Sequence, residues 1–494
     1  MAPTVSLPAD QENIWTFLTV ARVNPSNLKC ESLPILSIRN EYGRNFHLSW
    51  LGFWVAFLSW FAFSPLVPEA VSKDLQLTPA ELANSNVISL CATLVVRIVA
   101  GPAIDRYGPR KVMATLLVIG AIPSGLAGTV HNAQGLYVIR FFIGILGGTF
   151  VPCQAWTTVF FDKKVVGLAN ALAGGWGNSG GGFTFIIMVA LYNRLVADGL
   201  SSHSAWRAAF AIVPVPALLF IALMIMLFGT DHPSGRWSDR HKTLPTCSAP
   251  SQERAPSVQD LEAKVSSEKM TAQVSVEPVS AVDSAVNEPL DLRDTLTLLL
   301  NPLTWLPALS YLTTFGFELV VDANLANVLY GLYKGPSFDQ TKAGYIASTF
   351  GLLNIFSRPL GGYLGDLIYM RLGVNGKKGL MLALGIAQGL FAIGFGVYVD
   401  QHHSPSLGVV IGLFVVMGWF MESANGAAFA LVPHCNPNSN GLTSGIVGAS
   451  GNLGGVIFAL IFRFEATAGK SFWICGVLAV GLNAILSLIK VPRW

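Results

Sequence analysis

The chain has 494 residues, of which 52% are hydrophobic and only 12% are charged. A soluble protein of this length usually has about 25% charged residues, so the composition indicates a membrane protein. The formal net charge of +3 is too small to suggest binding to nucleic acid. The six cysteines are scattered and form no C-x-x-C pair, so we expect no disulfide framework, no zinc site and no cofactor.

Apolar runs recur along the chain, each close to the roughly 20 helical residues that cross a bilayer core of about 30 Å. Six precede a polar segment, at about 48–68, 82–103, 111–130, 134–156, 165–192 and 206–229. Six follow it, at about 298–322, 341–366, 377–399, 406–432, 441–463 and 471–491. We therefore expect an all-α membrane protein with twelve transmembrane helices in two pseudo-symmetric six-helix bundles.

This pattern divides the chain into four parts, with a tail at 1–47, a first bundle at 48–229, a linker at 230–297 and a second bundle with a short tail at 298–494. The linker is rich in Ser, Pro, Glu and Lys and has no apolar period, which is typical of a mobile segment without packed structure. Lys and Arg gather in the loops on one side of the predicted membrane. By the positive-inside rule this side, with the linker and both termini, is cytosolic.

Two arginines lie inside apolar runs, Arg97 in CATLVVRIVAGPAID and Arg358 in GLLNIFSRPLGGYLGD. A guanidinium at mid-membrane costs roughly 2.5 to 3.5 kcal/mol on insertion scales, so it normally faces a bundle interior or a wet cavity. Each is followed eight positions later by an acid, Asp105 or Asp366. Interhelical salt bridges are one interpretation; the other is a pair of planar donors that holds an oxyanion, carboxylate or phosphate between the halves.

The fifth and eleventh predicted spans contain related glycine-rich runs, GLANALAGGWGNSGGG and GLTSGIVGASGNLGG. Each has one asparagine between glycines, Asn178 in the first and Asn452 in the second. Small residues let spanning helices pack closely, which is a sufficient reason for the glycines. A buried amide is costly unless it is bonded, so the paired asparagines indicate a polar ligand or an interhelical bond. Repeats of this kind place a substrate site between the two halves.

The GWGNSG segment at 175–180 matches a dinucleotide-binding spacing, but no strand precedes it and it lies inside a span, so a nucleotide site is excluded. The chain also lacks the G-K-[ST] of a phosphate-binding loop, and no nucleophile–base cluster appears in the spans. We therefore expect that this protein is not an enzyme. Four aromatic residues stand on three of these segments among apolar neighbours, where packing is the usual role: Phe63, Phe150, Tyr311 and Phe315.

The segments GPAIDRYGPRKV and RFFIGILGGTFVPCQ, together with the two glycine runs, resemble the nitrate/nitrite porter family of the major facilitator superfamily, closely its fungal high-affinity members. The resemblance implies a twelve-helix rocker in the plasma membrane that holds nitrate, and also nitrite, between Arg97 and Arg358. It implies contacts to the ion from Asn178 and Asn452 and an aromatic clamp of Phe150, Tyr311 and Phe315, with Phe63 a looser match. Trp176 departs from the small residues usual in this signature.

Import of an anion against an interior-negative potential needs coupling, at about 2.3 kcal/mol per charge per 100 mV. The resemblance suggests proton symport, for which the carboxyls Glu422, Glu318 and Asp322 inside the predicted spans are candidate proton carriers. The alternative role for Glu422 is a structural bond to a neighbouring helix, which is the more common role for such a residue. A nitrate/nitrite exchanger needs no such carrier. The third interpretation is a nutrient sensor that transports nothing and signals through the linker.

Overall fold

The computed structural model describes residues 13–240, 292–436 and 439–491, so most of the predicted linker and both tips of the chain lie outside it. The described residues are helical apart from turns and isolated β-bridges. The helices before the linker are α1 (Ile14–Thr19), α2 (Glu41–Trp60), η2 (Val67–Val71), α3 (Ser72–Leu75), α4 (Pro79–Tyr107), α5 (Pro109–Leu126), η3 (Ala127–Thr129), α6 (Ala133–Ile143), η4 (Gly144–Thr149), α7 (Phe150–Phe160), α8 (Val166–Ala197), α9 (Ser202–Ile212), α10 (Pro214–Phe228) and η5 (Trp237–Asp239). After it come α11 (Leu292–Leu300), α12 (Pro302–Tyr333), α13 (Gln340–Leu353), α14 (Ser357–Gln401), α15 (Leu407–Cys435), α16 (Asn440–Phe464) and α17 (Ala468–Leu486).

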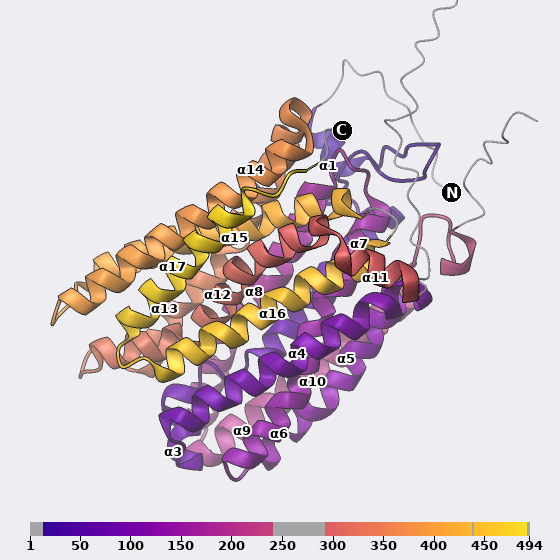
Figure 1. The fold of residues 1–494 in the computed structure, drawn as a ribbon. Helices are drawn as coiled ribbons and strands as arrows, with labels where there is room; N and C mark the ends of the chain where they lie inside the picture. The colour runs from indigo at the N-terminus through magenta and orange to yellow at the C-terminus, as the bar shows by residue number, and fades with distance from the viewer. Residues whose placement is uncertain (1–12, 241–291, 437–438, 492–494) are drawn as a thin grey trace, which may run out of the picture.

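The long helices run side by side in two groups, purple to magenta for the first half of the chain and red to yellow for the second (Figure 1). Helix α1 and the residues that follow α17 lie at one end of the bundle, which we call the α1 end, whereas α3 and α9 lie at the other, the α3 end. The halves meet mainly where α4 packs on α16 and where α8 packs on α13, α14 and α15.

Nine segments of the described chain are long and apolar enough to cross a membrane. They include α4, α8, α15, α16 and α17, and one of them, 340–401, joins α13 to α14 and turns at Gly373, where the backbone has a φ of 61°. Helices α2 and α12 are not among the nine, although they span 20 and 32 residues. The all-helical membrane fold is confirmed, whereas the number twelve stays a prediction.

Two spans are interrupted beside the predicted arginines. Between α6 and α7 the α-helix is replaced by the 3-10 segment η4. Between α13 and α14 the chain turns at residues 354–356, just before Arg358. Such interruptions leave carbonyl groups outside the regular helical ladder, where side chains can reach them. Broken helices thus bring polar backbone to the centre of the bundle.

The start of the predicted linker is packed, contrary to the sequence-based expectation. Trp237 is buried and donates from its indole nitrogen to the carbonyl of Asp105, at 3.0 Å. Asp231 accepts from the backbone of Arg110 at 3.2 Å and pairs with its side chain. Residues 230–240 therefore belong to the first half, because a buried tryptophan and a paired aspartate hold them on the ends of α4 and α5.

Candidate functional site

The two arginines are buried at the contact between the halves. The exposed fraction is 0% for Arg97 on α4 and 1% for Arg358 on α14. Arg97 donates from Nε to the carbonyl of Gly147 in η4 and from Nη1 to the carbonyl of Gly448 on α16, both at 2.9 Å. Arg358 donates from Nη2 to the hydroxyl of Tyr311, at 2.8 Å. Each side chain therefore keeps its position through bonds to uncharged groups.

In each guanidinium group, one nitrogen makes no hydrogen bond to a described residue. Arg97 Nη2 and Arg358 Nη1 are buried and have no hydrogen-bond partner among the described residues. A buried polar group without a partner costs roughly 1 to 3 kcal/mol, and more when it is charged. The two nitrogens come from different halves, so an acceptor that lies between them would satisfy both.

Both guanidinium groups lie over the same two aromatic rings. The Arg97 Cζ atom is 4.8 Å from the centroid of Phe150 and 5.0 Å from that of Phe315; for Arg358 the distances are 5.6 and 5.7 Å. The two rings are nearly parallel, with centroids 6.0 Å apart. Tyr311 stacks on Phe315 at 4.8 Å. The structure thus brings together five of the eight residues predicted to bind the ion, with both guanidinium groups over a set of nearly parallel aromatic rings.

Phe429 on α15 completes this aromatic group and was missed in the sequence. Its ring stands edge-on to Phe150 at 4.8 Å and to Tyr311 at 5.1 Å. It lies in an ordinary apolar run, GAAFALV, where nothing distinguishes it from a packing residue.

The glycine runs make room for the arginine of the opposite half. A Cβ atom on Gly448 of α16 would lie 3.2 Å from Arg97 Cδ. A Cβ on Gly175 of α8 would lie 2.3 Å from the carbonyl oxygen of Asn354 and 3.1 Å from Arg358 Cβ. At Gly175 only glycine permits this approach, and at Gly448 a Cβ atom would press on the Arg97 side chain. Each repeat thus supplies an arginine to the other half and a cradle for the arginine that it receives.

The acids of the repeat do not pair with the arginines, which removes the salt-bridge interpretation. Asp105 accepts from the backbone nitrogen of Leu442 at 3.2 Å, and Asp366 accepts from that of Leu168 at 2.7 Å. Each carboxylate thus sits at the N-terminus of the opposite half's glycine-rich helix, where the helix dipole favours negative charge. Asp366 is further paired with Lys377 at 2.9 Å. These contacts close the halves at the α1 end.

Glu318 on α12 interacts electrostatically with both arginines. Its two oxygens accept hydrogen bonds from the side-chain amides of three asparagines, Asn178, Asn354 and Asn425. Asn425 is oriented by Thr314, whose hydroxyl donates to its amide oxygen at 2.6 Å. Three amide donors favour the ionised form of a carboxyl and complete burial opposes it, so the role of Glu318 as a proton carrier stays a prediction.

The paired asparagines differ in their bonds. Asn178 donates to Glu318 across the contact between the halves, whereas Asn452 donates to the carbonyl of Gly448 in its own helix, at 3.0 Å. The amide oxygens of both are buried without a partner among the described residues. Each amide nitrogen donates one of its two N–H groups in these bonds, and the role of both asparagines as ligands of the ion stays a prediction.

Glu422 on α15 is buried and touches Ser357 through one oxygen, while its other oxygen has no partner in the described structure. The Ser357 hydroxyl also lies 2.7 Å from the carbonyl of Leu353. A hydroxyl carries one proton and can donate to only one of these acceptors. If it donates to Leu353, the contact with Glu422 requires a proton on the carboxyl, which then donates to the serine. Asp322, the third candidate, is 7% exposed on α12.

Phe63 is not brought to this site, contrary to the prediction from resemblance. Its ring packs on Phe210 at 4.3 Å and on Trp206 at 6.2 Å, both on α9, and it lies beneath the guanidinium of Arg140. Phe63 therefore packs against α9 and is not part of the aromatic group around Arg97 and Arg358.

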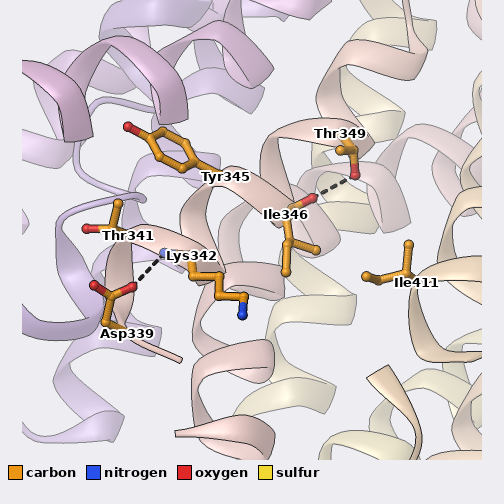
Figure 2. Close-up of a pocket in the computed structure, with 7 residues that line it drawn as sticks. All are labelled: Asp339, Thr341, Lys342, Tyr345, Ile346, Thr349 and Ile411. Carbon is orange, nitrogen blue, oxygen red and sulfur yellow. Dashed lines mark hydrogen bonds between the residues drawn. The ribbon is translucent and has the colours of Figure 1, made fainter. Parts of the chain in front are cut away.

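A separate surface pocket of about 370 Å³ lies along α13 and contains none of these residues (Figure 2). Asp339, Thr341, Lys342, Tyr345, Ile346 and Thr349 line it, with Ile411 from α15 on the far side. The Asp339 carboxylate caps α13 by accepting from the backbone nitrogen of Lys342, at 2.8 Å. Its polar groups serve the helix, so we do not assign the pocket a ligand.

Comparison with known proteins identifies the family to which this chain belongs. The Major Facilitator Superfamily model matches residues 49–333. The structure of the proton:xylose symporter XylE has the same fold, with a TM-score of 0.60 at 17% identity over 90% of this chain and 95% of that one. The chain therefore belongs to the major facilitator superfamily of membrane transporters, and within it to the family of the nitrate transporters described next.

Two plant proteins represent these relatives. The high-affinity nitrate transporter 2.3 of Oryza sativa subsp. japonica is 30% identical over 95% of this chain and 82% of its own length. The high affinity nitrate transporter 2.5 of Arabidopsis thaliana is also 30% identical, over 99% of this chain and 85% of its own length. The protein is thus a transporter and not an enzyme.

Proposed function

We propose that this protein imports nitrate, and also nitrite, across the plasma membrane by proton symport with alternating access. The names of its relatives supply the substrate, and one observation carries the assignment. Two buried guanidinium groups, one from each half, lie over the same pair of rings, and each has a nitrogen without a partner. A planar, weakly hydrated anion with three acceptor oxygens suits both the flat aromatic rings and the paired donors.

The charges of the site support a single bound anion. Arg97 and Arg358 carry two positive charges, and Glu318, held by its three amides, carries one negative charge. One nitrate ion brings the sum to zero, which offsets the cost of burying net charge in a low-dielectric interior. A second anion would leave the closed site charged, so we expect one nitrate per cycle.

Glu422 is our candidate proton carrier, because its contact with Ser357 fits a protonated carboxyl in the closed arrangement. It would take up a proton when the site opens outward and lose it to the cytosol when the site opens inward. With two protons per nitrate, each cycle carries one net positive charge inward, and an interior-negative potential then assists import at about 2.3 kcal/mol per 100 mV.

We place the α1 end, with α1 and residues 487–491, on the cytosolic side of the membrane and the α3 end on the outer side. The cycle follows from the contacts described above. Nitrate binding reduces the repulsion between the two guanidinium groups, which permits the halves to close around the ion. Release inward requires Asp105 and Asp366 to leave the helix N-termini that they bind at the α1 end.

The test is uptake of labelled nitrate, with simultaneous current recording, in cells that express the protein and lack their own nitrate uptake. We expect an inward current that grows with nitrate and with external acidity. Nitrate/nitrite counterflow without current or acid stimulation would establish the exchanger instead. Protein at the cell surface that carries no flux, yet signals, would establish the sensor.

A further inference from the structure

Arg140 is a further buried arginine inside an apolar segment, and the site above does not use it. It lies on α6 and is 5% exposed. Its one hydrogen bond to a described residue runs from Nη1 to the hydroxyl of Ser85 on α4, at 3.2 Å. It takes part in none of the ion pairs of the described chain, and its Cζ atom lies 5.7 Å from the Phe63 centroid. A guanidinium has five N–H donors, so most of its hydrogen-bonding capacity is unused.

A small cavity of about 20 Å³ opens beside this guanidinium at the contact between the halves. Asn86 and Ser89 of α4 line it with Arg140 on one side, and Leu319 and Ala323 of α12 close it on the other. This volume holds about one water molecule, so an anion fits only when the halves part at this end. Because α12 belongs to the second half, that parting would open the cavity outward.

Two helices, α12 and α4, run from the cavity to the central site. On α12, Leu319 and Ala323 continue at intervals of four residues the face that carries Tyr311 and Phe315. On α4, the buried positions 85, 89, 93 and 97 follow the same interval and are Ser, Ser, Thr and Arg. This polar stripe spans about 18 Å of helix, from the partner of Arg140 to Arg97.

The stripe offers hydroxyl groups along its whole length. Ser85 accepts from Arg140, and Ser89 lines the cavity and accepts from the indole of Trp60 at 2.7 Å. Thr93 donates to the carbonyl of Gly144 at 2.5 Å, one turn before the Gly147 carbonyl that holds Arg97. Ser85, Ser89, Thr93 and Arg97 thus form a row of buried polar side chains on α4, which runs from the partner of Arg140 to the central site.

We propose that Arg140 is an outer binding subsite for a small monovalent oxyanion, occupied after the halves part at the α3 end and before the ion reaches Arg97. It rests on the proposed import function and adds a residue to it. The subsite acts by holding an anion at an intermediate depth, where the surrounding apolar side chains would otherwise exclude it. It binds the ion in transit and makes no contact with it in the closed state.

The experiment measures nitrate KM separately from the two faces of the membrane. External KM comes from uptake into cells, and KM from the α1 end comes from uptake into inside-out vesicles, each normalised to the amount of protein in the membrane. We expect Arg140→Gln to raise external KM about tenfold, to leave Vmax within about twofold, and to leave KM from the α1 end unchanged. Arg140→Lys, which keeps the charge, should fall between the wild type and Arg140→Gln.

A second variant leaves Arg140 and its contacts intact. Asn86→Asp adds a negative charge to the cavity wall and should also raise external KM alone. Lys73→Gln is the matched control, since it removes one positive charge at the same end from an exposed side chain paired with Glu69, and it should leave both KM values unchanged.

Three results would overturn the proposal: equal KM shifts from both faces, a loss of Vmax alone, or an unchanged external KM in Arg140→Gln and Asn86→Asp. The first two are what a purely structural tie between α6 and α4 produces. Failure of the proposed import function is distinguishable from these, because it appears in the wild type as absence of nitrate flux.

Discussion

Replacement of Arg358 by lysine keeps the positive charge and removes the planar set of N–H donors, so it tests these two properties separately. Arg358 Nη2 holds Tyr311 at 2.8 Å, while Nη1, on the other arm of the fork, has no partner in the described structure. A lysine ammonium keeps the positive charge, but it is a single point donor and cannot serve the tyrosine and an anion in these two directions. The substitution therefore removes one directed, charge-assisted hydrogen bond and retains the long-range attraction.

The loss of one such bond is about 1.5 to 3 kcal/mol, which corresponds to a rise in Kd of roughly 10- to 150-fold. The measurement is the KM of labelled nitrate uptake in Arg358→Lys at a clamped membrane potential, normalised to surface protein. Arg463→Lys is the matched control, because that arginine is exposed on α16. A KM for Arg358→Lys within about threefold of the wild type would refute the reasoning, since the fork would then make no bond to the ion.

Three further substitutions test the surroundings of the arginines. Glu318→Gln leaves one acceptor oxygen for three amide donors, at a cost of roughly 1 to 3 kcal/mol for each unsatisfied donor, and should abolish net uptake and counterflow alike; counterflow at the wild-type rate would contradict this. Glu422→Gln resembles the neutral carboxyl and should retain nitrate counterflow while the nitrate-induced current and its acid stimulation disappear; an intact, pH-dependent current would show that the proton travels elsewhere. Gly175→Ala places a Cβ atom 2.3 Å from a backbone oxygen of the other half and should stop uptake at normal surface abundance, whereas Gly331→Ala, where nothing lies within 4 Å, should transport normally; equal rates in the two variants would exclude close contact at Gly175 from the cycle.

The two central arginines were predictable because a charge inside an apolar run is visible along the chain. The duplication was visible for the same reason, since both halves repeat an arginine, an acid eight residues later and a glycine-rich run. Arg140 gives the same kind of signal in GLYVIRFFIGIL, but it is not part of the duplicated pattern.

Roles that depend on a partner far along the chain were decided only by the tertiary structure. Glu318 and Glu422 are both acids in apolar segments, yet three amides surround one and a single hydroxyl touches the other. Phe63 and Phe150 are both phenylalanines among apolar neighbours, yet only Phe150 meets the arginines.

The sequence by itself determined that the chain forms apolar membrane helices and which charges must be sheltered, because both follow from the local cost of placing polar groups in hydrocarbon. The tertiary structure decided which residues shelter them. Arg97 and the Gly448 carbonyl that it binds are 351 positions apart, and their contact depends on how two whole bundles pack, which no local pattern encodes.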